Sequence, residues 1–315
     1  MMNNRTWNRA LACSMAVVMI VGPGVSRAHD GDDHPKQATL GSKHPGGANT
    51  SLANQATNPA AALVQLQLQN VFVPDSDNSS GYANTFIVQP VIPFNLGADS
   101  YFQSLIVRPT IPLAVTTPNP DGREAQTTAV GDTTVLVVPA HATPPHKKNS
   151  GHEFGYTWGP VAAIVIPTST DKRTGGDNLA AGPGLLGIAA TKNVFTEGDS
   201  LQIGAYGYQT WDVASSNHDV STTFAGPIAV YHFKELFDQP GWYLGWTDQL
   251  MSWDWETNSA DDGKATIPLG ARLGRVFNIG AQPMNIFIES DYYAKHRGTS
   301  PEWDIKLNVT FLFPK

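Results

Sequence analysis

The last apolar run of the chain, residues 302–313, alternates regularly between apolar and polar side chains. One set comprises Trp303, Ile305, Leu307, Val309, Phe311 and Phe313, and the intervening set comprises Asp304, Lys306, Asn308, Thr310 and Leu312. Side chains two residues apart point to the same face of a β-strand, so this run predicts a strand with one apolar face. In a soluble sandwich the polar face would meet solvent, and in a membrane barrel it would line the lumen.

Eleven further runs of this kind precede it, separated by clusters of Asp, Asn, Ser, Gly and Pro that are typical of turns. The twelve predicted strands are Ala61–Val73, Ala83–Ile92, Gln103–Val115, Thr127–Pro139, Glu153–Ile166, Asn178–Thr191, Ser200–Trp211, Val220–Phe233, Gly241–Trp253, Lys264–Val276, Met284–Ala294 and Glu302–Phe313. Bacterial membrane barrels have an even number of antiparallel strands of about 9–11 residues. We therefore expect an all-β fold, a transmembrane antiparallel β-barrel of about 12 strands.

Two runs cannot be assigned to faces by their alternation. Residues 161–166 are apolar at every position, and residues 241–253 change phase midway. Aromatic residues concentrate near the ends of many runs, for example at Trp211, Trp253 and Trp303. Because Trp and Tyr settle at the headgroup level of a bilayer, this placement favours the girdles of a membrane barrel over ordinary core or hairpin aromatics.

The first 28 residues, 1–28, predict a secretory signal peptide. Arg5 and Arg9 precede an apolar stretch at 10–21, and small residues stand before a cleavage site after Ala28. The stretch is too short to span a bilayer as a helix, which disfavours an uncleaved anchor. Residues 29–60 are rich in His, Asp and Gly and poor in large apolar side chains, so we expect a disordered periplasmic tail. The barrel is expected to occupy 61–315.

Charge and composition narrow the possible functions. The net charge is −7, whereas a nucleic-acid-binding protein needs clustered Lys and Arg to neutralise phosphates, so we expect no nucleic-acid partner. The only cysteine, Cys13, lies in the predicted signal peptide, so the predicted mature chain has no disulfide. No later segment approaches 18 consecutive apolar residues, so any membrane span must be a strand.

Charged residues at polar positions of the predicted strands are the candidates for a transport pathway. A Lys or Arg facing lipid at mid-depth costs about 2–4 kcal/mol, so we place these residues on the lumen side. The candidates are Arg108, Arg272, Glu289, Asp291, Asp304 and Lys306. Two interpretations stay open: the charges pair across strands and fill the barrel, or they line an open path, for which about twelve strands leave more room than eight.

The predicted tail contains a weak metal-binding pattern, made of His29, Asp30, Asp32, Asp33 and His34. Its mixed nitrogen and oxygen ligands suit several transition metals, but the spacing matches no closed zinc site. A solvated tail is the simpler interpretation, and we expect no cofactor. The sequence also has no Gly-x-Ser-x-Gly nucleophile motif. We therefore expect no catalytic residues and no enzymatic activity.

Several short segments, taken in order, resemble a known family. They include Ile87–Phe94, Arg108–Pro112, Ile166–Asp171, Gly241–Tyr243, Gly274–Phe277, Pro301–Trp303 and Phe311–Pro314. Over about residues 60–315 the chain resembles the outer-membrane transporter family named for the meta-pathway of phenol degradation, formerly mislabelled neuromedin U. The resemblance implies a porin-like barrel with a passive-transport role. The His/Asp tail and the His-rich connection at 140–152 depart from the family pattern.

The sequence therefore predicts a channel in the outer membrane of a Gram-negative bacterium that allows passive diffusion of small solutes. The family name suggests hydrophobic or aromatic solutes. The alternatives are a structural or adhesive barrel without transport or, less favoured, an outer-membrane enzyme or metal-related protein. The expected partners are outer-membrane lipid and lipopolysaccharide, the barrel-assembly machinery acting on the C-terminal strand, and a small-molecule solute.

Overall fold

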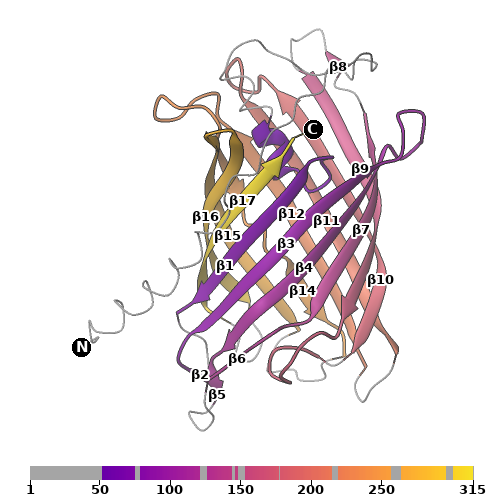
Figure 1. The fold of residues 1–315 in the computed structure, drawn as a ribbon, viewed down its shortest axis with the longest axis vertical. Helices are drawn as coiled ribbons and strands as arrows, with labels where there is room; N and C mark the ends of the chain where they lie inside the picture. The colour runs from indigo at the N-terminus through magenta and orange to yellow at the C-terminus, as the bar shows by residue number, and fades with distance from the viewer. Residues whose placement is uncertain are drawn as a thin grey trace, which may run out of the picture. The chain divides into compact units, whose positions relative to one another are not determined.

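The computed structural model describes residues 52–74, 79–120, 126–143, 146–147, 153–176, 178–214, 219–256, 264–295 and 301–314. The predicted signal peptide, residues 29–51 of the predicted tail and most of the His-rich connection lie outside the described residues. Nearly all of the described strands belong to one antiparallel sheet that closes into a barrel (Figure 1).

Within the described residues, twelve strand positions follow one another around the barrel in chain order. They are β1 (Val64–Val73), β3 (Ala83–Asn95), β4 (Ser104–Thr117), β7 (Thr133–Ala142), β9 (Glu153–Ile166), β10 (Leu179–Lys192), β11 (Ser200–Ala214), β12 (Ser221–His232), the pair β13 (Trp242–Trp246) and β14 (Met251–Asp254), β15 (Ala265–Ile279), β16 (Gln282–Lys295) and β17 (Trp303–Phe313). The pairing of β17 with β1, from Val64↔Phe313 to Phe72↔Ile305, closes the ring. A closed barrel leaves no unpaired strand edge.

Four short strands extend the hairpins. β6 (Thr127–Ala129) pairs with β4, β8 (His146–Lys147) pairs with β9, and β2 (Ser79–Ser80) pairs with β5 (Asn119–Pro120). We call the end of the barrel where β1 begins and β17 ends the first rim, which is the upper end in Figure 1, and the other end the second rim.

The predicted all-β barrel of twelve strands is confirmed, and each predicted run overlaps one strand position. The fourth run differs most, because its first residues form β6 and the chain leaves the sheet at 130–132 before β7 begins. Proline explains one further irregularity. The β15–β16 register shifts between Ile267 and Pro268, where the proline has no N–H to donate to the ladder.

The alternation of the last strand correctly predicts its two faces. Asp304 and Thr310 are almost completely buried inside the barrel, whereas Trp303, Ile305 and Leu307 are exposed on the outside. The same parity holds in β16, where Glu289 and Asp291 are buried and Ile288 and Tyr292 are exposed. The polar faces of β16 and β17 therefore line the lumen.

The outer surface of the barrel is largely apolar. Exposed aliphatic side chains on the outer faces of the strands include Ile164, Leu185, Ile203, Leu244, Leu269, Leu273, Ile288, Ile305 and Leu307. Exposed aromatic side chains lie toward the two rims: Phe94, Tyr101, Phe154, Tyr156 and Phe313 at the first, and Trp211, Trp255, Tyr292 and Trp303 at the second. Soluble monomers rarely expose apolar areas of this extent, and an apolar band between aromatic girdles is typical of an outer-membrane barrel.

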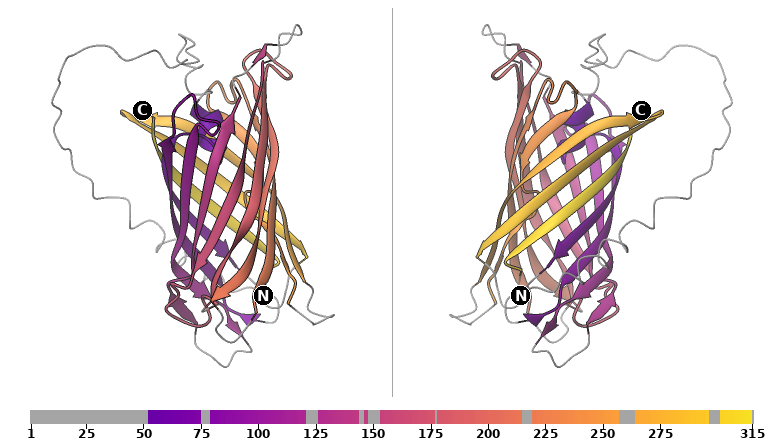
Figure 2. Two further views of the ribbon diagram at one scale, coloured as in Figure 1. Left: turned by 90° about the vertical axis from the view of Figure 1, so that its right-hand side faces the viewer. Right: turned by 90° about the vertical axis from the view of Figure 1, so that its left-hand side faces the viewer.

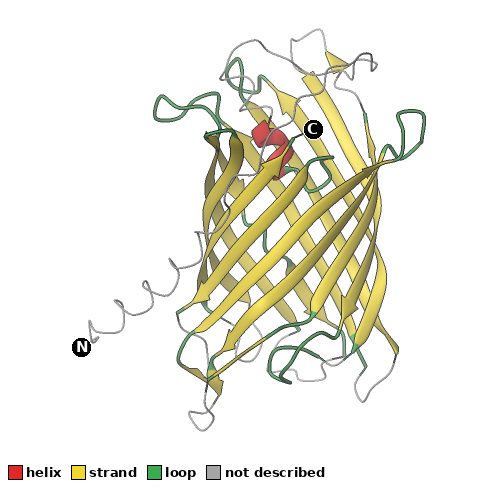
Figure 3. Ribbon diagram, viewed as in Figure 1, coloured by secondary structure: helices red, strands yellow, loops and turns green. Residues whose placement is uncertain are grey.

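The described residues contain no helix long and apolar enough to cross a membrane. Their one helix, at residues 52–57, lies inside the first rim (Figures 2 and 3). This differs from the predicted disordered tail, which was expected to extend to residue 60. Ala53, Ala56 and Ala60 are buried against the barrel interior and Leu52 packs beside them, so mostly small side chains give this segment its packing surface.

Candidate solute pathway inside the barrel

The lumen has a polar side and an apolar side. Strands β15, β16, β17 and β1 contribute charged and amide side chains, such as Glu289, Lys306 and Gln69. Across the lumen, β7, β9 and β10 contribute buried apolar side chains, namely Leu136, Val138, Val161, Ala163, Leu186 and Ile188. The inner positions of β9 are thus as apolar as its outer ones, which is why alternation could not assign residues 161–166.

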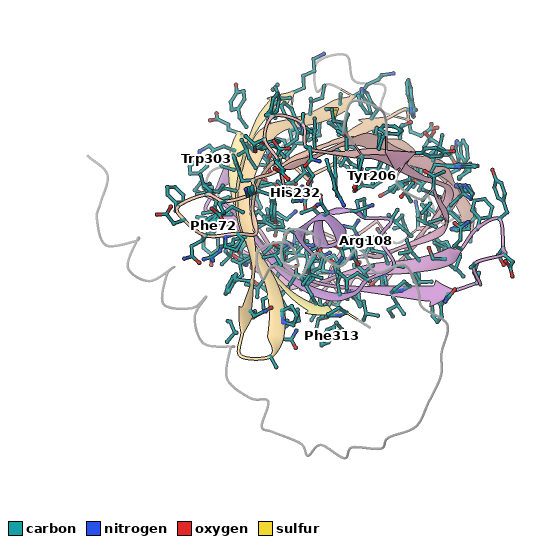
Figure 4. All side chains as sticks on the ribbon, turned by 90° about the horizontal axis from the view of Figure 1, so that it is seen from above. Phe72, Arg108, Tyr206, His232, Trp303 and Phe313 are labelled. Carbon is teal, nitrogen blue, oxygen red and sulfur yellow. The ribbon has the colours of Figure 1, made fainter. Side chains whose placement is uncertain are left out.

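All six charged residues predicted from the sequence face the lumen. Arg272, Glu289, Asp291, Asp304 and Lys306 are each less than 10% exposed. Arg108 lines an internal cavity, and Figure 4 shows it pointing into the barrel from the wall opposite Tyr206. The structure divides the six into two groups, because Arg108 lies apart from the other five in its hydrogen bonds and ion pairs.

The larger group is organised around Asp248, which the sequence analysis did not single out. Asp248 Oδ2 lies 3.1 Å from Arg272 Nη1, and Asp248 Oδ1 forms an ion pair with Lys306 Nζ. Lys306 Nζ also lies 3.9 Å from Glu289 Oε1. Glu289 in turn accepts hydrogen bonds from the Asp248 backbone N–H at 3.0 Å and the Thr247 hydroxyl at 3.2 Å. Two cations and two carboxylates from four consecutive strand positions therefore form one network.

Asp248 reaches this network because the ninth strand position is interrupted. β13 ends at Trp246 and β14 begins at Met251, and residues 247–250 leave the sheet and enter the lumen. We call residues 247–250 the inner loop. β12 pairs with β13 as far as Val230↔Gly245 and with β14 from Ala225↔Met251. The change of phase in residues 241–253 was the sequence signal for this excursion.

The inner loop also reaches the two remaining aspartates. Asp291 and Asp304 are directly opposite each other on β16 and β17, and both face inward. Gln249 Nε2 donates to Asp291 Oδ2 at 3.1 Å and to Asp304 Oδ2 at 2.6 Å. The Tyr293 hydroxyl donates to the same Asp304 oxygen at 2.7 Å. Gln249 thus bridges two like charges that would repel each other without it.

Arg108 belongs to a separate hydrogen-bond network of amides. Its Nη2 donates to Gln89 Oε1 at 2.8 Å, and Gln69 Nε2 donates to the same oxygen at 3.0 Å. Gln69 also donates to Gln67, and Gln67 donates to Gln65, each at 3.1 Å. No carboxylate in the described part of the chain forms an ion pair with Arg108.

The helix at 52–57 is held inside the first rim by hydrogen bonds to β11 and β12. The Thr57 hydroxyl lies 2.9 Å from His232 Nε2 and 3.2 Å from Gln202 Oε1. Gln202 Nε2 donates to the Asn54 carbonyl at 2.7 Å, and the Ser200 hydroxyl donates to Asn54 Oδ1 at 2.8 Å. The helix therefore occupies part of the lumen cross-section at this rim.

A cavity of about 60 Å³ lies between the helix segment and the inner loop. Its lining includes Thr57 and Asn58 from the helix side, Thr247 and Asp248 from the inner loop, and Arg108, Tyr206, Arg272, Asn285 and Asn308 from the wall. This volume exceeds the roughly 10–15 Å³ that a single water molecule needs, so the cavity has room for several waters.

The predicted metal ligands His29, Asp30, Asp32, Asp33 and His34 lie outside the described residues. Among the residues that the structure does describe, no group of three or more His, Cys, Asp or Glu side chains is arranged to hold a metal ion.

Comparison with known proteins adds no assignment. No family model matches the chain, and no curated protein matches it at a significant level. The resemblance to the phenol-degradation transporter family therefore stays a prediction from the short segments described above.

Proposed function

We propose that the protein is an outer-membrane channel that allows small solutes to diffuse passively through its lumen. The observation that carries this proposal is a cavity lined by buried charged and amide side chains inside a closed barrel with an apolar exterior. An apolar band would anchor the barrel in lipid, and a polar interior would hydrate a solute in transit. The proposed location is the outer membrane of a Gram-negative bacterium, with lipopolysaccharide and the barrel-assembly machinery as partners.

Apolar side chains on one side of the lumen support the proposal that the solutes include hydrophobic or aromatic compounds. Leu136, Val161 and Leu186 belong to a buried apolar cluster opposite the charged network, and Val91 and Phe287 line the cavity itself. A solute with a polar end and an apolar body would contact Arg108 and these two cavity-lining apolar side chains. We propose no catalytic role for the polar groups, and lipase and protease assays on the folded protein would test that point.

A second candidate function is a structural barrel without transport. The helix at 52–57 and the inner loop both occupy the lumen, and the ion pairs around Asp248 fill space that a wide pore would leave open. Lumen charges that pair across strands can serve stability alone. The two functions differ in one measurable property, which is the conductance of the folded protein.

Single-channel recording in planar bilayers tests the proposal. The full chain, purified and folded in detergent, should produce discrete conductance steps in KCl, and heat-denatured protein from the same preparation should produce none. Liposome swelling with sugars, amino acids and aromatic compounds would then rank the solutes. Folded protein that inserts into bilayers without conductance, and vesicles that do not swell, would favour the structural barrel.

A further inference from the structure

The lining of the internal cavity contains one more cation than anion. Its charged residues are Arg108, Arg272 and Asp248. Asp248 already forms ion pairs with Arg272 and Lys306, so its two oxygens are committed to those cations. Arg108 is left with an amide oxygen, Gln89 Oε1, as its acceptor among the described residues.

The guanidinium of Arg108 is also incompletely hydrogen-bonded. Its Nε is buried and has no hydrogen-bond partner. Arginine keeps its proton in proteins, so this half-buried guanidinium stays charged. A cation that is partly withdrawn from solvent is stabilised by a counter-ion. An anion entering the cavity would supply that counter-ion.

We propose that this cavity binds a small monocarboxylate, with Arg108 as the anion-binding group. The planar guanidinium matches the geometry of a carboxylate and can hold it through two parallel hydrogen bonds. A single negative charge balances the single excess positive charge of the lining. The proposal rests on the proposed function only in that the solute reaches the cavity through the lumen.

The cavity also limits the size and shape of the ligand. A cavity of about 60 Å³ that has room for several waters admits a carboxylate of acetate or propionate size. The inward-facing side chains of Phe287 and Val91 line the same cavity and would contact the short alkyl group. Tyr206 also lines the cavity, and its hydroxyl offers a further hydrogen-bond donor.

Recording in the presence of acetate tests the site. A bound carboxylate should reduce the chloride current through the full-length channel in a saturable way, and acetamide, its neutral counterpart of equal size, should not. In Arg108→Gln the acetate effect should be at least about tenfold weaker, as expected when a charge-assisted hydrogen bond is lost. Arg108→Lys should keep part of it, because the positive charge remains.

Arg275→Gln is the matched control. Arg275 lies on the same barrel but outside the cavity lining, where its Nη2 donates to Gln239 Oε1 at 2.8 Å and its guanidinium lies over the Trp242 ring. The same chemical change there should leave the acetate effect at the wild-type level. Folding of each variant is checked by its heat-modifiable migration in detergent gels.

Acetate binding is measured independently by saturation-transfer NMR on the detergent-solubilised full chain. If the wild-type protein binds acetate but never conducts, and Arg108→Gln abolishes the binding, the channel proposal is overturned and the binding-site proposal is supported. A conducting wild-type protein that neither binds acetate nor distinguishes it from acetamide would overturn the site and leave the channel. Equal acetate effects in Arg108→Gln and the wild type would also overturn it. If Arg108→Gln does not fold, the comparisons of acetate with acetamide and of Arg108→Lys with Arg275→Gln decide.

Discussion

Replacing Asp248 by Asn should destabilise the folded barrel by about 3–5 kcal/mol, the cost of breaking a buried ion pair by removing one partner. The substitution keeps the size of the side chain and the backbone N–H that donates to Glu289. What it removes is the negative charge shared by Arg272 and Lys306. The effect is therefore electrostatic, and not a consequence of lost packing.

The expected loss of stability follows from the interactions that Lys306 and Arg272 would retain. Lys306 would keep a single carboxylate, Glu289, at 3.9 Å, which is too long for a good hydrogen bond. Arg272 would lose its ion pair and keep only the face of the Phe287 ring, 5.2 Å from its guanidinium carbon. A cation–π contact contributes about 0.5–2 kcal/mol and offsets part of the loss. We therefore expect the cost to lie in the lower half of the range for buried pairs.

The assay is reversible unfolding by urea of the full chain in lipid vesicles, followed by tryptophan fluorescence. The control is Asp171→Asn, which removes an ion pair with Arg173 in an exposed connection, where solvent screens the interaction. That variant should unfold at the wild-type urea midpoint. A double-mutant cycle with Lys306→Met should show coupling, because part of the cost of Asp248→Asn is the uncompensated Lys306 charge.

A small change in the free energy of unfolding would contradict a buried ion pair at Asp248. If Asp248→Asn lowers the free energy of unfolding by less than about 1 kcal/mol with an unchanged urea dependence, the pair behaves as an exposed surface pair. Asp248 would then lie outside the lumen in the folded protein. An absence of coupling with Lys306→Met would lead to the same conclusion.

Three further predictions concern the helix, a turn and a strand. Ala53→Glu places a charge at a fully buried helix position, so it should release the helix from the first rim and raise the single-channel conductance in planar bilayers. Burial raises the pKa of Asp199, but hydrogen bonds from the Tyr231 hydroxyl and three backbone amides lower the pKa by more than burial raises it. The pKa of Asp199 therefore lies below the ordinary 3.8. Its contribution to stability is therefore complete above that ordinary value and lost as the pH falls through the folded-state pKa. Urea unfolding between pH 5 and pH 3 should show this loss in the wild type and a flatter profile in Asp199→Asn. Gly270→Ala should cost about 1–3 kcal/mol in the same assay, since a Cβ there would overlap the Asp291 carboxylate and the Ser290 carbonyl.

Much of the barrel could be predicted from the sequence because its strands obey a local rule. In β17 every second side chain faces outward, so the parity of Asp304 and Lys306 alone indicates that they point inward. The same parity correctly places Arg108, Arg272, Glu289 and Asp291. A closed antiparallel ring also leaves little choice of topology, since each strand pairs with its neighbours in the chain.

The parts that sequence patterns missed depend on contacts across the lumen. The helix at 52–57 is short and built on Ala53 and Ala56, whose small side chains carry no strong hydrophobic periodicity. It is held by partners about 145–175 positions away, Gln202 and His232. Asp248 was missed for a similar reason, because its side chain is identified as a lumen group only once residues 247–250 are known to leave the sheet.

The two interpretations of the lumen charges, filling and lining, apply to different residues. Five of the six predicted charges are joined by the inner loop into networks, in which Asp248 or Gln249 supplies each group with an ion pair or a hydrogen bond except Glu289, which accepts from the inner-loop backbone. Arg108 has no such partner and faces the cavity. An ion pair inside the lumen has little net charge and attracts a solute weakly, whereas a cation without a carboxylate partner attracts every anion that enters. The selectivity of the proposed channel should therefore depend on Arg108 far more than on the other five residues, although all six occupy equivalent inward positions on their strands.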